Sequence, residues 1–321
     1  MTAIYEPDNL IDLLPWDKLI PALDEFFRKD VCCPIRHHHE INVLNNDAAT
    51  LLLMPAWVEG GYLGVKQVNV FPGNSKLGKA GLNSHYLLSS ATTGELLARF
   101  DGNIITARRT AAAAALAARY LSREDSKHLL MVGAGRVARN VVPAMMSVRD
   151  IETVEVWDIN PANADIFVDE LRVLGINAKR VEINQLESAV KKADIISCAT
   201  LSSKPLILGD WVQSGTHVDL IGSFTPTMRE ADDQLMKKSN IFTDFKEAAL
   251  HETGDLISPL ANGIITKDSI LGDFISLSHN QKVGRAALNL PTDCITVFKA
   301  VGSSIEDLAA ATLAYDQIQV K

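Results

Sequence analysis

The sequence contains no apolar run that approaches the ~20 residues of a membrane-spanning helix, and no apolar signal segment opens it. Cysteine is scarce, with 4 in 321 residues, and the four are not spaced as metal ligands or as a redox pair. Cys32 and Cys33 are neighbours, and a disulfide between neighbouring residues is strained. We therefore expect reduced, mostly buried thiols in a cytoplasmic protein that has no membrane partner.

An excess of basic residues is also missing, since 31 lysines and arginines face 39 aspartates and glutamates, for a net charge of −8. This balance disfavours nucleic acid and anionic membranes as partners, because both select basic surfaces. Hydrophobic residues make up 47% of the chain and charged residues 22%, which is typical of a globular protein. At ~150 residues per domain, the length allows two domains.

A strand–turn–helix pattern stands in the middle of the chain. The apolar run 128–132 leads into Gly133-x-Gly135-x-x-Ala138, and a second strand is followed by Asp158. In a dinucleotide-binding turn, the first glycine permits the tight turn and the second lets the backbone approach the pyrophosphate. The small third residue lets the helix pack on the strand, and the helix N-terminus offers N–H groups to the phosphates. The order of these features predicts a dinucleotide site rather than a turn without a ligand.

The residue at the end of the second strand indicates which nucleotide is bound. Asp158 can accept hydrogen bonds from both ribose hydroxyls and would repel a 2′-phosphate, and the next two residues are not arginines. We therefore favour NAD(H), with NADP(H) as the alternative. A later strand closes at Ala199 and Thr200, at the edge where the nicotinamide is expected. The predicted cofactor-binding residues are Thr110, Gly133, Ala134, Gly135, Arg136, Val137, Ala138, Asp158, Ala199, Thr200 and Gly222.

The hydrophobic pattern changes along the chain. A helical stretch and a β-rich region punctuated by Gly and Pro turns come first, and from residue 129 onward strands and helices alternate. Such alternation predicts βαβ units and a parallel sheet, and the polar segment 122–127 is the expected linker. Helices are expected at 11–30, 108–121, 162–174 and 296–315. Strands are expected at 35–43, 50–55, 64–71, 85–90, 96–101, 129–132, 153–157, 178–181, 194–199, 217–221 and 240–243.

Three basic residues of the first region are candidate ligands for an anion. Lys66 lies within an otherwise apolar strand, Arg36 follows Cys-Cys-Pro-Ile, and Arg109 opens an alanine-rich helix. Arginine offers a planar fork to a carboxylate and lysine a compact point charge, so the three together could hold an anionic substrate. A single cation in a strand more often points to solvent, and sequence spacing does not show whether the three converge.

We interpret two other sets of polar residues as structural: three consecutive histidines and an acidic segment. His37, His38 and His39 are consecutive, and neighbours on a strand point to opposite faces, so we expect surface or packing histidines and no metal site. The acidic segment 244–255 is expected to be a solvated helix face.

The chain contains, in this order, the segments 64–66, 101–112, 133–135, 296–302 and 307–310. Together these segments resemble the ornithine cyclodeaminase/mu-crystallin family. The resemblance implies a Rossmann domain flanked by a discontinuous domain for substrate binding and dimerisation, in a homodimer. We therefore expect an α/β fold with a Rossmann dinucleotide-binding domain at 122–296. The discontinuous α+β substrate-binding and dimerisation domain would be formed by 1–121 with 297–321.

The resemblance also implies residue roles. It implies that Arg36, Lys66 and Arg109 hold a substrate carboxylate, and Ser84 matches a position near the active site where the family often has Thr or Ser. Phe224 marks a departure, because cyclodeaminases resemble Val-Gly-Gly-Asp-x-Pro where this chain has Ile-Gly-Ser-Phe-Thr-Pro. Phenylalanine cannot exchange a proton, which disfavours cyclodeaminase activity. Hydride transfer is unaffected, since the cofactor carries that chemistry.

We therefore expect a nicotinamide-dependent reductase of cyclic imino acids. It would convert Δ1-pyrroline-2-carboxylate to L-proline and Δ1-piperideine-2-carboxylate to L-pipecolate. A protonated, iminium-like substrate is the better electrophile and would need no distinct general acid, and if one is used, Lys66 is the candidate proton donor. Phe224 would offer an apolar wall to the substrate ring. The alternatives are an alanine dehydrogenase that acts on the imine of pyruvate and ammonia, an ornithine cyclodeaminase, and a crystallin-like nucleotide-binding protein without catalysis.

Overall fold

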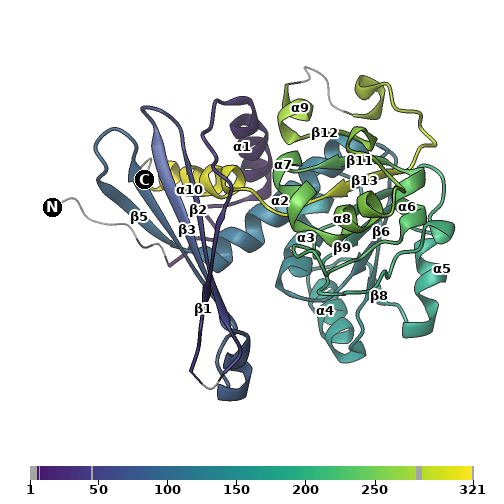
Figure 1. The fold of residues 1–321 in the computed structure, drawn as a ribbon. Helices are drawn as coiled ribbons and strands as arrows, with labels where there is room; N and C mark the ends of the chain where they lie inside the picture. Colours follow the sequence, from purple (N-terminus) through teal and green to yellow (C-terminus); the bar gives the residue numbers. More distant parts are fainter. Residues whose placement is uncertain (1–5, 7, 45, 280–283, 320–321) are drawn as a thin grey trace. The chain divides into compact units, whose positions relative to one another are not determined.

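The computed structural model describes residues 6, 8–44, 46–279 and 284–319 (Figure 1). Contacts within the chain divide it into two compact units. Unit 1 holds the described residues up to Arg109 together with those from Ser303 onward, and unit 2 holds Thr110–Gly302. The predicted α/β fold with a parallel sheet is confirmed, and the parallel sheet lies in unit 2.

In its described residues, unit 1 forms a five-stranded antiparallel sheet in the order β1-β2-β3-β4-β5. Helix α10 (Ser304–Gln319), from the end of the chain, packs on β2, β3 and β4 and also on α1 (Trp16–Arg28), so sequence-distant segments build one unit (Figure 1). The strands are β1 (His37–Ile41), β2 (Ala49–Trp57), β3 (Tyr62–Val70), β4 (Leu82–Ser90) and β5 (Leu96–Asp101), with a 3-10 turn at Pro72–Leu77.

One face of this sheet is buried. Side chains of a strand alternate between faces, and on β4 Ser84, Tyr86 and Leu88 are buried whereas the residues between them are exposed. On the neighbouring β3, Lys66 stands opposite Tyr86, and Val68 stands opposite Ser84. A lysine in the buried row of a sheet needs a compensating negative charge.

In its described residues, unit 2 carries an eight-stranded parallel sheet in the order β12-β11-β13-β10-β9-β6-β7-β8. Residues 129–132 of β6 are all apolar and buried, which is typical of a parallel strand covered on both faces. The strands are β6 (His128–Val132), β7 (Thr153–Trp157), β8 (Ala178–Arg180), β9 (Ile195–Cys198), β10 (His217–Leu220), β11 (Asn240–Thr243), β12 (Ile270–Asp273) and β13 (Thr296–Lys299).

The remaining helices follow from local signals. Helix α4 (Pro161–Val173) begins after Asn160, whose side chain accepts the N–H of Ala162 at 3.1 Å, and proline at the first position costs no hydrogen bond. The amphipathic pattern predicted α1, and its Leu19, Ile20, Leu23, Phe26 and Phe27 are buried as expected. The other helices are α2 (Gly102–Leu121), α3 (Arg136–Met146), α5 (Leu186–Val190), α6 (Asp233–Lys238), α7 (Lys246–Glu252), α8 (Gly254–Ala261) and α9 (Phe274–Ser278), with 3-10 turns at Ile183–Gln185, Gly209–Trp211, Lys267–Ser269 and Arg285–Leu288.

The structure corrects the prediction near the C-terminus. Residues 296–315 are not one interrupted helix, because Thr296–Lys299 form β13 between β10 and β11, and α10 begins only at Ser304. Gly302 has a φ of +83°, a conformation that glycine adopts without strain, where the chain leaves the sheet. The compact units divide at 109/110 and 302/303. The sequence placed these divisions at 121/122 and 296/297, and the latter would cut through β13.

The burial of the cysteines also differs from the prediction. All four are free, as expected, but only Cys198 is buried. Cys198 belongs to the hydrophobic core around the parallel sheet, which explains its burial. The other three, which are exposed or half-buried, are Cys32, Cys33 and Cys294.

The prediction of a solvated helix face at 244–255 is wrong at both ends of the segment. Asp244 and Asp255 are fully buried. The Oδ2 of Asp244 accepts the N–H of Val301 at 2.8 Å, and the Oδ1 of Asp255 accepts the N–H of Glu230 at 2.8 Å. Both carboxylates therefore accept hydrogen bonds from backbone N–H groups, which need an acceptor inside the fold.

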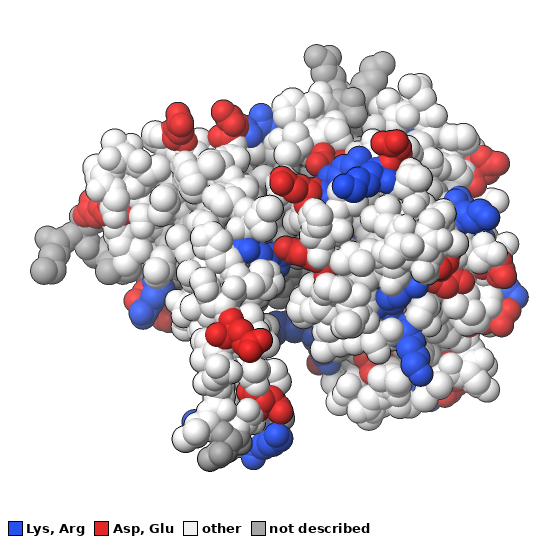
Figure 2. All heavy atoms as spheres, viewed as in Figure 1, with Lys and Arg blue, Asp and Glu red and all other residues white. Residues whose placement is uncertain are grey.

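In the described part of the chain, no helix is long and apolar enough to cross a membrane. On the face shown in Figure 2, acidic and basic side chains are interspersed. His37, His38 and His39 are all exposed on β1, and the described residues contain no group of side chains that could hold a metal ion.

Candidate active site

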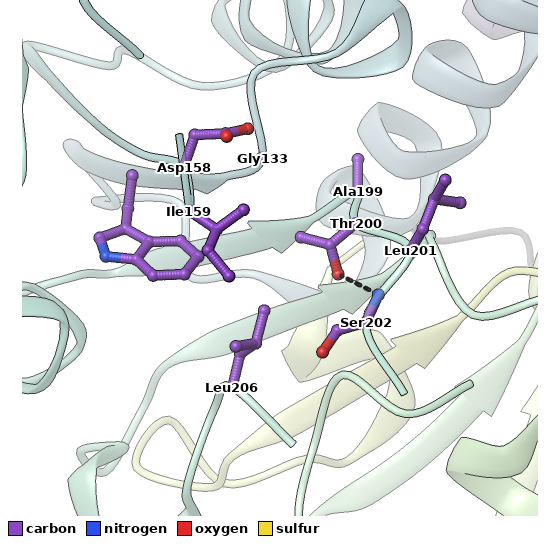
Figure 3. Close-up of a pocket in the computed structure, with 9 residues that line it drawn as sticks. Gly133, Asp158, Ile159, Ala199, Thr200, Leu201, Ser202 and Leu206 are labelled. Carbon is purple, nitrogen blue, oxygen red and sulfur yellow. Dashed lines mark hydrogen bonds between the residues drawn. The ribbon is translucent and has the colours of Figure 1, made fainter. Parts of the chain in front are cut away.

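A pocket of about 380 Å³ lies in unit 2 at the carboxyl ends of β6, β7 and β9 (Figure 3). In open parallel sheets, ligands bind at these ends of the strands. The pocket combines apolar walls with one carboxylate and two hydroxyl side chains, as small-molecule sites commonly do. It is lined by Gly133, Trp157, Asp158, Ile159, Ala199, Thr200, Leu201, Ser202 and Leu206.

The two glycines of the predicted turn are required for different reasons. Gly133 has a φ of +104°, and a Cβ there would come within 2.6 Å of the Ala199 carbonyl oxygen. Both the backbone conformation and the close approach therefore require glycine. A Cβ on Gly135 would meet no atom of the described residues within 4 Å. Packing thus does not explain Gly135, whereas the approach of a phosphate to the backbone does.

Helix α3 begins directly after this turn. Its N-cap is Gly135, which has no side chain that could accept the first N–H groups of the helix. The positive end of the helix dipole and these donors suit an anion. Ala138 is buried and lets α3 pack closely on the sheet, whereas Arg136 is exposed and Val137 is half-buried.

The Asp158 side chain lies at the wall of the pocket. Its Oδ2 accepts the N–H of Ala134 at 2.8 Å, and its Oδ1 accepts the N–H of Asn160 at 2.8 Å. Each carboxylate oxygen has a further lone pair, so the group can also accept hydrogen bonds from ribose hydroxyls. Its neighbour Ile159 is 77% exposed and offers no positive charge to a 2′-phosphate. These residues fit NAD(H).

Glu230, which the sequence analysis did not identify, ties together the loops that follow β9 and β10. It is 0% exposed, and its Oε1 accepts the N–H and the hydroxyl of Thr200, each at 2.8 Å. Its Oε2 accepts the N–H of Gly222 at 2.7 Å. A Cβ on Gly222 would lie 1.9 Å from the Thr200 carbonyl oxygen, so packing requires this glycine. Thr200 and Gly222 are therefore direct neighbours.

Of the predicted residues in unit 2, four line the pocket: Gly133, Asp158, Ala199 and Thr200. The other eight do not line it: Thr110, Ala134, Gly135, Arg136, Val137, Ala138, Gly222 and Phe224. Thr110 on α2 is buried, and Phe224, in the loop after β10, is 44% exposed. An aromatic ring exposed to this extent in a loop can contact a ligand.

Unit 1 contains a buried cluster of charged residues. Lys66 is 2% exposed, and its Nζ lies 2.8 Å from Oδ1 and 2.7 Å from Oδ2 of Asp307. The Nε of Arg109 lies 2.9 Å from Oδ1 of Asp307, and its Nη1 lies 2.7 Å from Oε2 of Glu306. Both acids are fully buried in the first turn of α10. They compensate the two cations, which could not otherwise be buried.

Neighbouring charges and burial set the acidity of Lys66. Burial lowers the pKa of Lys66 to about 8, Asp307 acts against this, and the positive charges of Arg109 and Arg36 lower it further. Arg36 is half-buried, and its charge acts on Lys66, so it lies within electrostatic reach of the Lys66 ammonium. The structure therefore brings the three predicted cations into one part of unit 1. A lysine with this pKa can exchange a proton near neutral pH.

Two buried hydroxyls lie on the same face of the sheet as Lys66. A Cβ on Gly64 would lie 1.8 Å from the Tyr86 hydroxyl oxygen, and a Cβ on Gly102 would lie 2.2 Å from the Ser84 hydroxyl oxygen. Burial, and then the negative charge of Asp307, raises the pKa of Tyr86 well above its usual value, so its hydroxyl stays neutral. Within the described residues, neither hydroxyl has a hydrogen-bond partner.

Sequence reasoning identified the cations of unit 1 but not the acids that hold them. Asp307 lies within segment 307–310, which carries part of the family resemblance, so a signal was present. Acidic residues in the first turn of a helix are common for reasons of helix stability alone. Their contact with Lys66 and Arg109 could therefore be identified only from the tertiary structure.

Comparisons with known proteins agree with this arrangement. Residues 9–321 match the model of the ornithine cyclodeaminase/mu-crystallin family. The chain is 41% identical over 270 residues to a Δ1-pyrroline-2-carboxylate reductase of Paracoccus denitrificans, with 84% of each chain covered. It resembles the structure of the Thermococcus litoralis Δ1-pyrroline-2-carboxylate reductase in complex with NADH and L-proline, with a TM-score of 0.90, 35% identity, and 99% of this chain and 97% of that chain covered. An archaeal alanine dehydrogenase dimer with bound NAD gives a TM-score of 0.89 at 29% identity, over 99% and 96% of the chains.

Proposed function

The chain belongs to the ornithine cyclodeaminase/mu-crystallin family, and we propose that it is an NAD(H)-dependent reductase that converts Δ1-pyrroline-2-carboxylate to L-proline. The observation that carries the proposal is the buried pair of cations in unit 1, Lys66 and Arg109, each held by a carboxylate of α10. Such a pair suits a substrate that carries a carboxylate next to the reacting carbon. The glycine-rich turn and Asp158 in unit 2 suit the cofactor.

Reduction of the C=N bond needs one hydride and, for a neutral imine, one proton. A reduced nicotinamide, when bound, would supply the hydride for the imine carbon. Arg109, whose guanidinium stays charged, offers a planar fork to the substrate carboxylate, and Arg36 adds positive charge. Lys66 can give the proton of its Nζ to the imine nitrogen, because its pKa is lowered to about 8. Asp307 holds Lys66 in position to bind the substrate carboxylate and to donate the proton.

The substrate range is expected to include Δ1-piperideine-2-carboxylate, which carries the same carboxylate and C=N bond in a larger ring and would give L-pipecolate. The exposed ring of Phe224 offers an apolar surface to such rings and cannot exchange a proton, which supports reduction over cyclodeamination. NADPH is the less favoured cofactor, because Asp158 would repel its 2′-phosphate.

A homodimer in the cytoplasm is the expected form of the protein. On the sheet face of unit 1 that lies opposite Lys66, Pro55, Val65 and Leu87 are cross-strand neighbours and are all partly exposed. An apolar sheet face of this kind suits a second copy of the chain. The dimeric alanine dehydrogenase relative supports the same assembly, and four free cysteines suit a reducing compartment.

A steady-state substrate panel tests the proposal. Purified protein is given Δ1-pyrroline-2-carboxylate, Δ1-piperideine-2-carboxylate, or pyruvate with ammonia, each with NADH and with NADPH, and cofactor oxidation is followed together with amino-acid formation. We expect NADH oxidation that depends on the cyclic imines and yields L-proline or L-pipecolate. Turnover only of pyruvate with ammonia would replace the proposal with alanine dehydrogenase. Ammonia release from ornithine without net NADH change would indicate a cyclodeaminase, and NADH binding without turnover would refute the enzyme.

A further inference from the structure

We propose that Glu230 is a positioning residue for the cofactor, and that binding of NAD(H) is coupled to ionisation of the Glu230 carboxyl group. The inference rests on the proposed function only in that unit 2 must bind NAD(H). Glu230 itself does not line the pocket. It acts through two loops that it joins.

The carboxylate of Glu230 accepts hydrogen bonds from both loops. Its Oε1 accepts the N–H and the hydroxyl of Thr200, each at 2.8 Å, and its Oε2 accepts the N–H of Gly222 at 2.7 Å and that of Ser223 at 3.3 Å. N–H groups can only donate, so a protonated carboxyl could direct its proton only at the Thr200 hydroxyl. The N–H groups would then face a neutral acceptor, whose hydrogen bonds are about half as strong. The ionised form therefore holds the loops better.

The two loops are in tight contact with each other and with the glycine-rich turn. Thr200 lines the pocket (Figure 3), and a Cβ on Gly222 would lie 1.9 Å from its carbonyl oxygen. A Cβ on Gly133 would lie 2.6 Å from the carbonyl oxygen of Ala199. Because these backbones touch, a shift of the loop at Thr200 changes the wall of the pocket. The hydrogen bonds of Glu230 thus influence how well the cofactor fits.

Burial, together with the neighbouring charges, places the ionisation of Glu230 near neutral pH. Asp255 accepts the backbone N–H of Glu230 at 2.8 Å and lies 3.3 Å from the Nζ of Lys299, whose charge also acts on Glu230. Cys198, a neutral thiol whose pKa is raised well above its usual value by burial, and Asp219 lie in the same group. Burial raises the pKa of Glu230 to about 7, with Lys299 acting against this and Asp255 adding to it.

The coupling has a definite sign. Cofactor binding needs ordered loops and therefore favours the ionised carboxylate, so affinity should rise as the pH rises through the pKa of Glu230, about 7. If binding lowers that pKa by about one unit, the Kd for NADH should be about fivefold higher at pH 6 than at pH 8. About 0.4 proton should be released per NADH bound at pH 7.

Calorimetric titration of NADH tests the inference, at pH 6, 7 and 8 and in two buffers of different ionisation heat. The wild-type protein should show the fivefold change in Kd and the release of protons. Glu230→Gln keeps the size of the side chain but points an amide NH₂ at N–H donors, so we expect about tenfold weaker binding at pH 8 that no longer changes with pH. Glu247→Gln, at an exposed position of α7, is the matched control and should behave like the wild type.

Two measurements keep the test decisive if Glu230→Gln folds poorly. Proton release by the wild-type protein needs no variant. Thr200→Val removes the hydroxyl hydrogen bond to the carboxylate, together with the bond that the hydroxyl accepts from the Ser202 N–H, and should move the pH midpoint upward. NADH binding without pH dependence or proton release would overturn the inference and leave the proposed function intact. A pH dependence that persists in Glu230→Gln would also overturn it. Failure of the wild-type protein to bind NADH at every pH would overturn both.

Discussion

Replacement of Lys66 by methionine removes a buried positive charge while most of the length of the side chain is kept. The Nζ of Lys66 lies 2.7 Å from Oδ2 of Asp307, and both side chains are buried. In the variant, Asp307 keeps, among the cations of the described residues, only the Nε of Arg109 at 2.9 Å, and Arg109 also pairs with Glu306. The buried carboxylates of Asp307 and Glu306 then share the guanidinium of Arg109, which lowers the free energy of unfolding.

The expected size of both effects follows from this geometry. Removal of one partner of a buried ion pair costs about 3–5 kcal/mol, and because Arg109 still compensates part of the charge, we expect a loss of about 3 kcal/mol in the free energy of unfolding. Loss of a buried, charged ligand for the substrate carboxylate should lower kcat/KM by about 10²–10³-fold, which corresponds to about 3–4 kcal/mol.

The double variant Lys66→Met with Asp307→Asn separates stability from function. It removes both charges of the closest pair, so it should recover most of the lost stability while kcat/KM stays low. Urea unfolding gives the stability, and NADH oxidation with Δ1-pyrroline-2-carboxylate gives kcat/KM. If the double variant regains activity together with stability, or if Lys66→Met stays within about threefold of the wild type in kcat/KM, Lys66 is not a substrate ligand.

Above pH 8, kcat/KM for the imine should fall by about tenfold per pH unit, because the pKa of Lys66 is about 8 and its positive charge holds the substrate carboxylate. The pH profile of Lys66→Arg should lack this fall, because arginine stays charged. Gly135→Ala should weaken NADH binding by about tenfold at an unchanged urea midpoint, whereas Gly133→Ala should also lower the midpoint, because its φ is +104°. Equal midpoints for the two variants would contradict this reasoning. Asp158→Ser should move the ratio of kcat/KM for NADH and NADPH about tenfold toward NADPH, with the exposed Asp169→Ser as control, and an unchanged ratio would refute the ribose contact.

Periodicity predicted most elements, and where it failed the segments were short. The predicted bounds of β5, β7 and β11 coincide with the observed ones. Strand β12 was not predicted, and strand β13 was predicted as part of a helix. Each of the two strands has four residues. Four residues are too few to distinguish a period of 2 from one of 3.6. Strand β13 owes its conformation to β10 and β11 on either side, which lie far away in the chain.

The sequence by itself determined the dinucleotide turn, the acid that follows the second strand, and the identity of the cations. These signals can be read locally, because the glycine spacing, the apolar runs and the acid after the second strand stand close together in the sequence. The tertiary structure decided which charges meet. Lys66 and Asp307 are 241 residues apart in the chain, and Glu230 reaches Thr200 across 30 residues. Coulomb interaction and desolvation depend on distance and burial in space, which packing sets and sequence spacing does not.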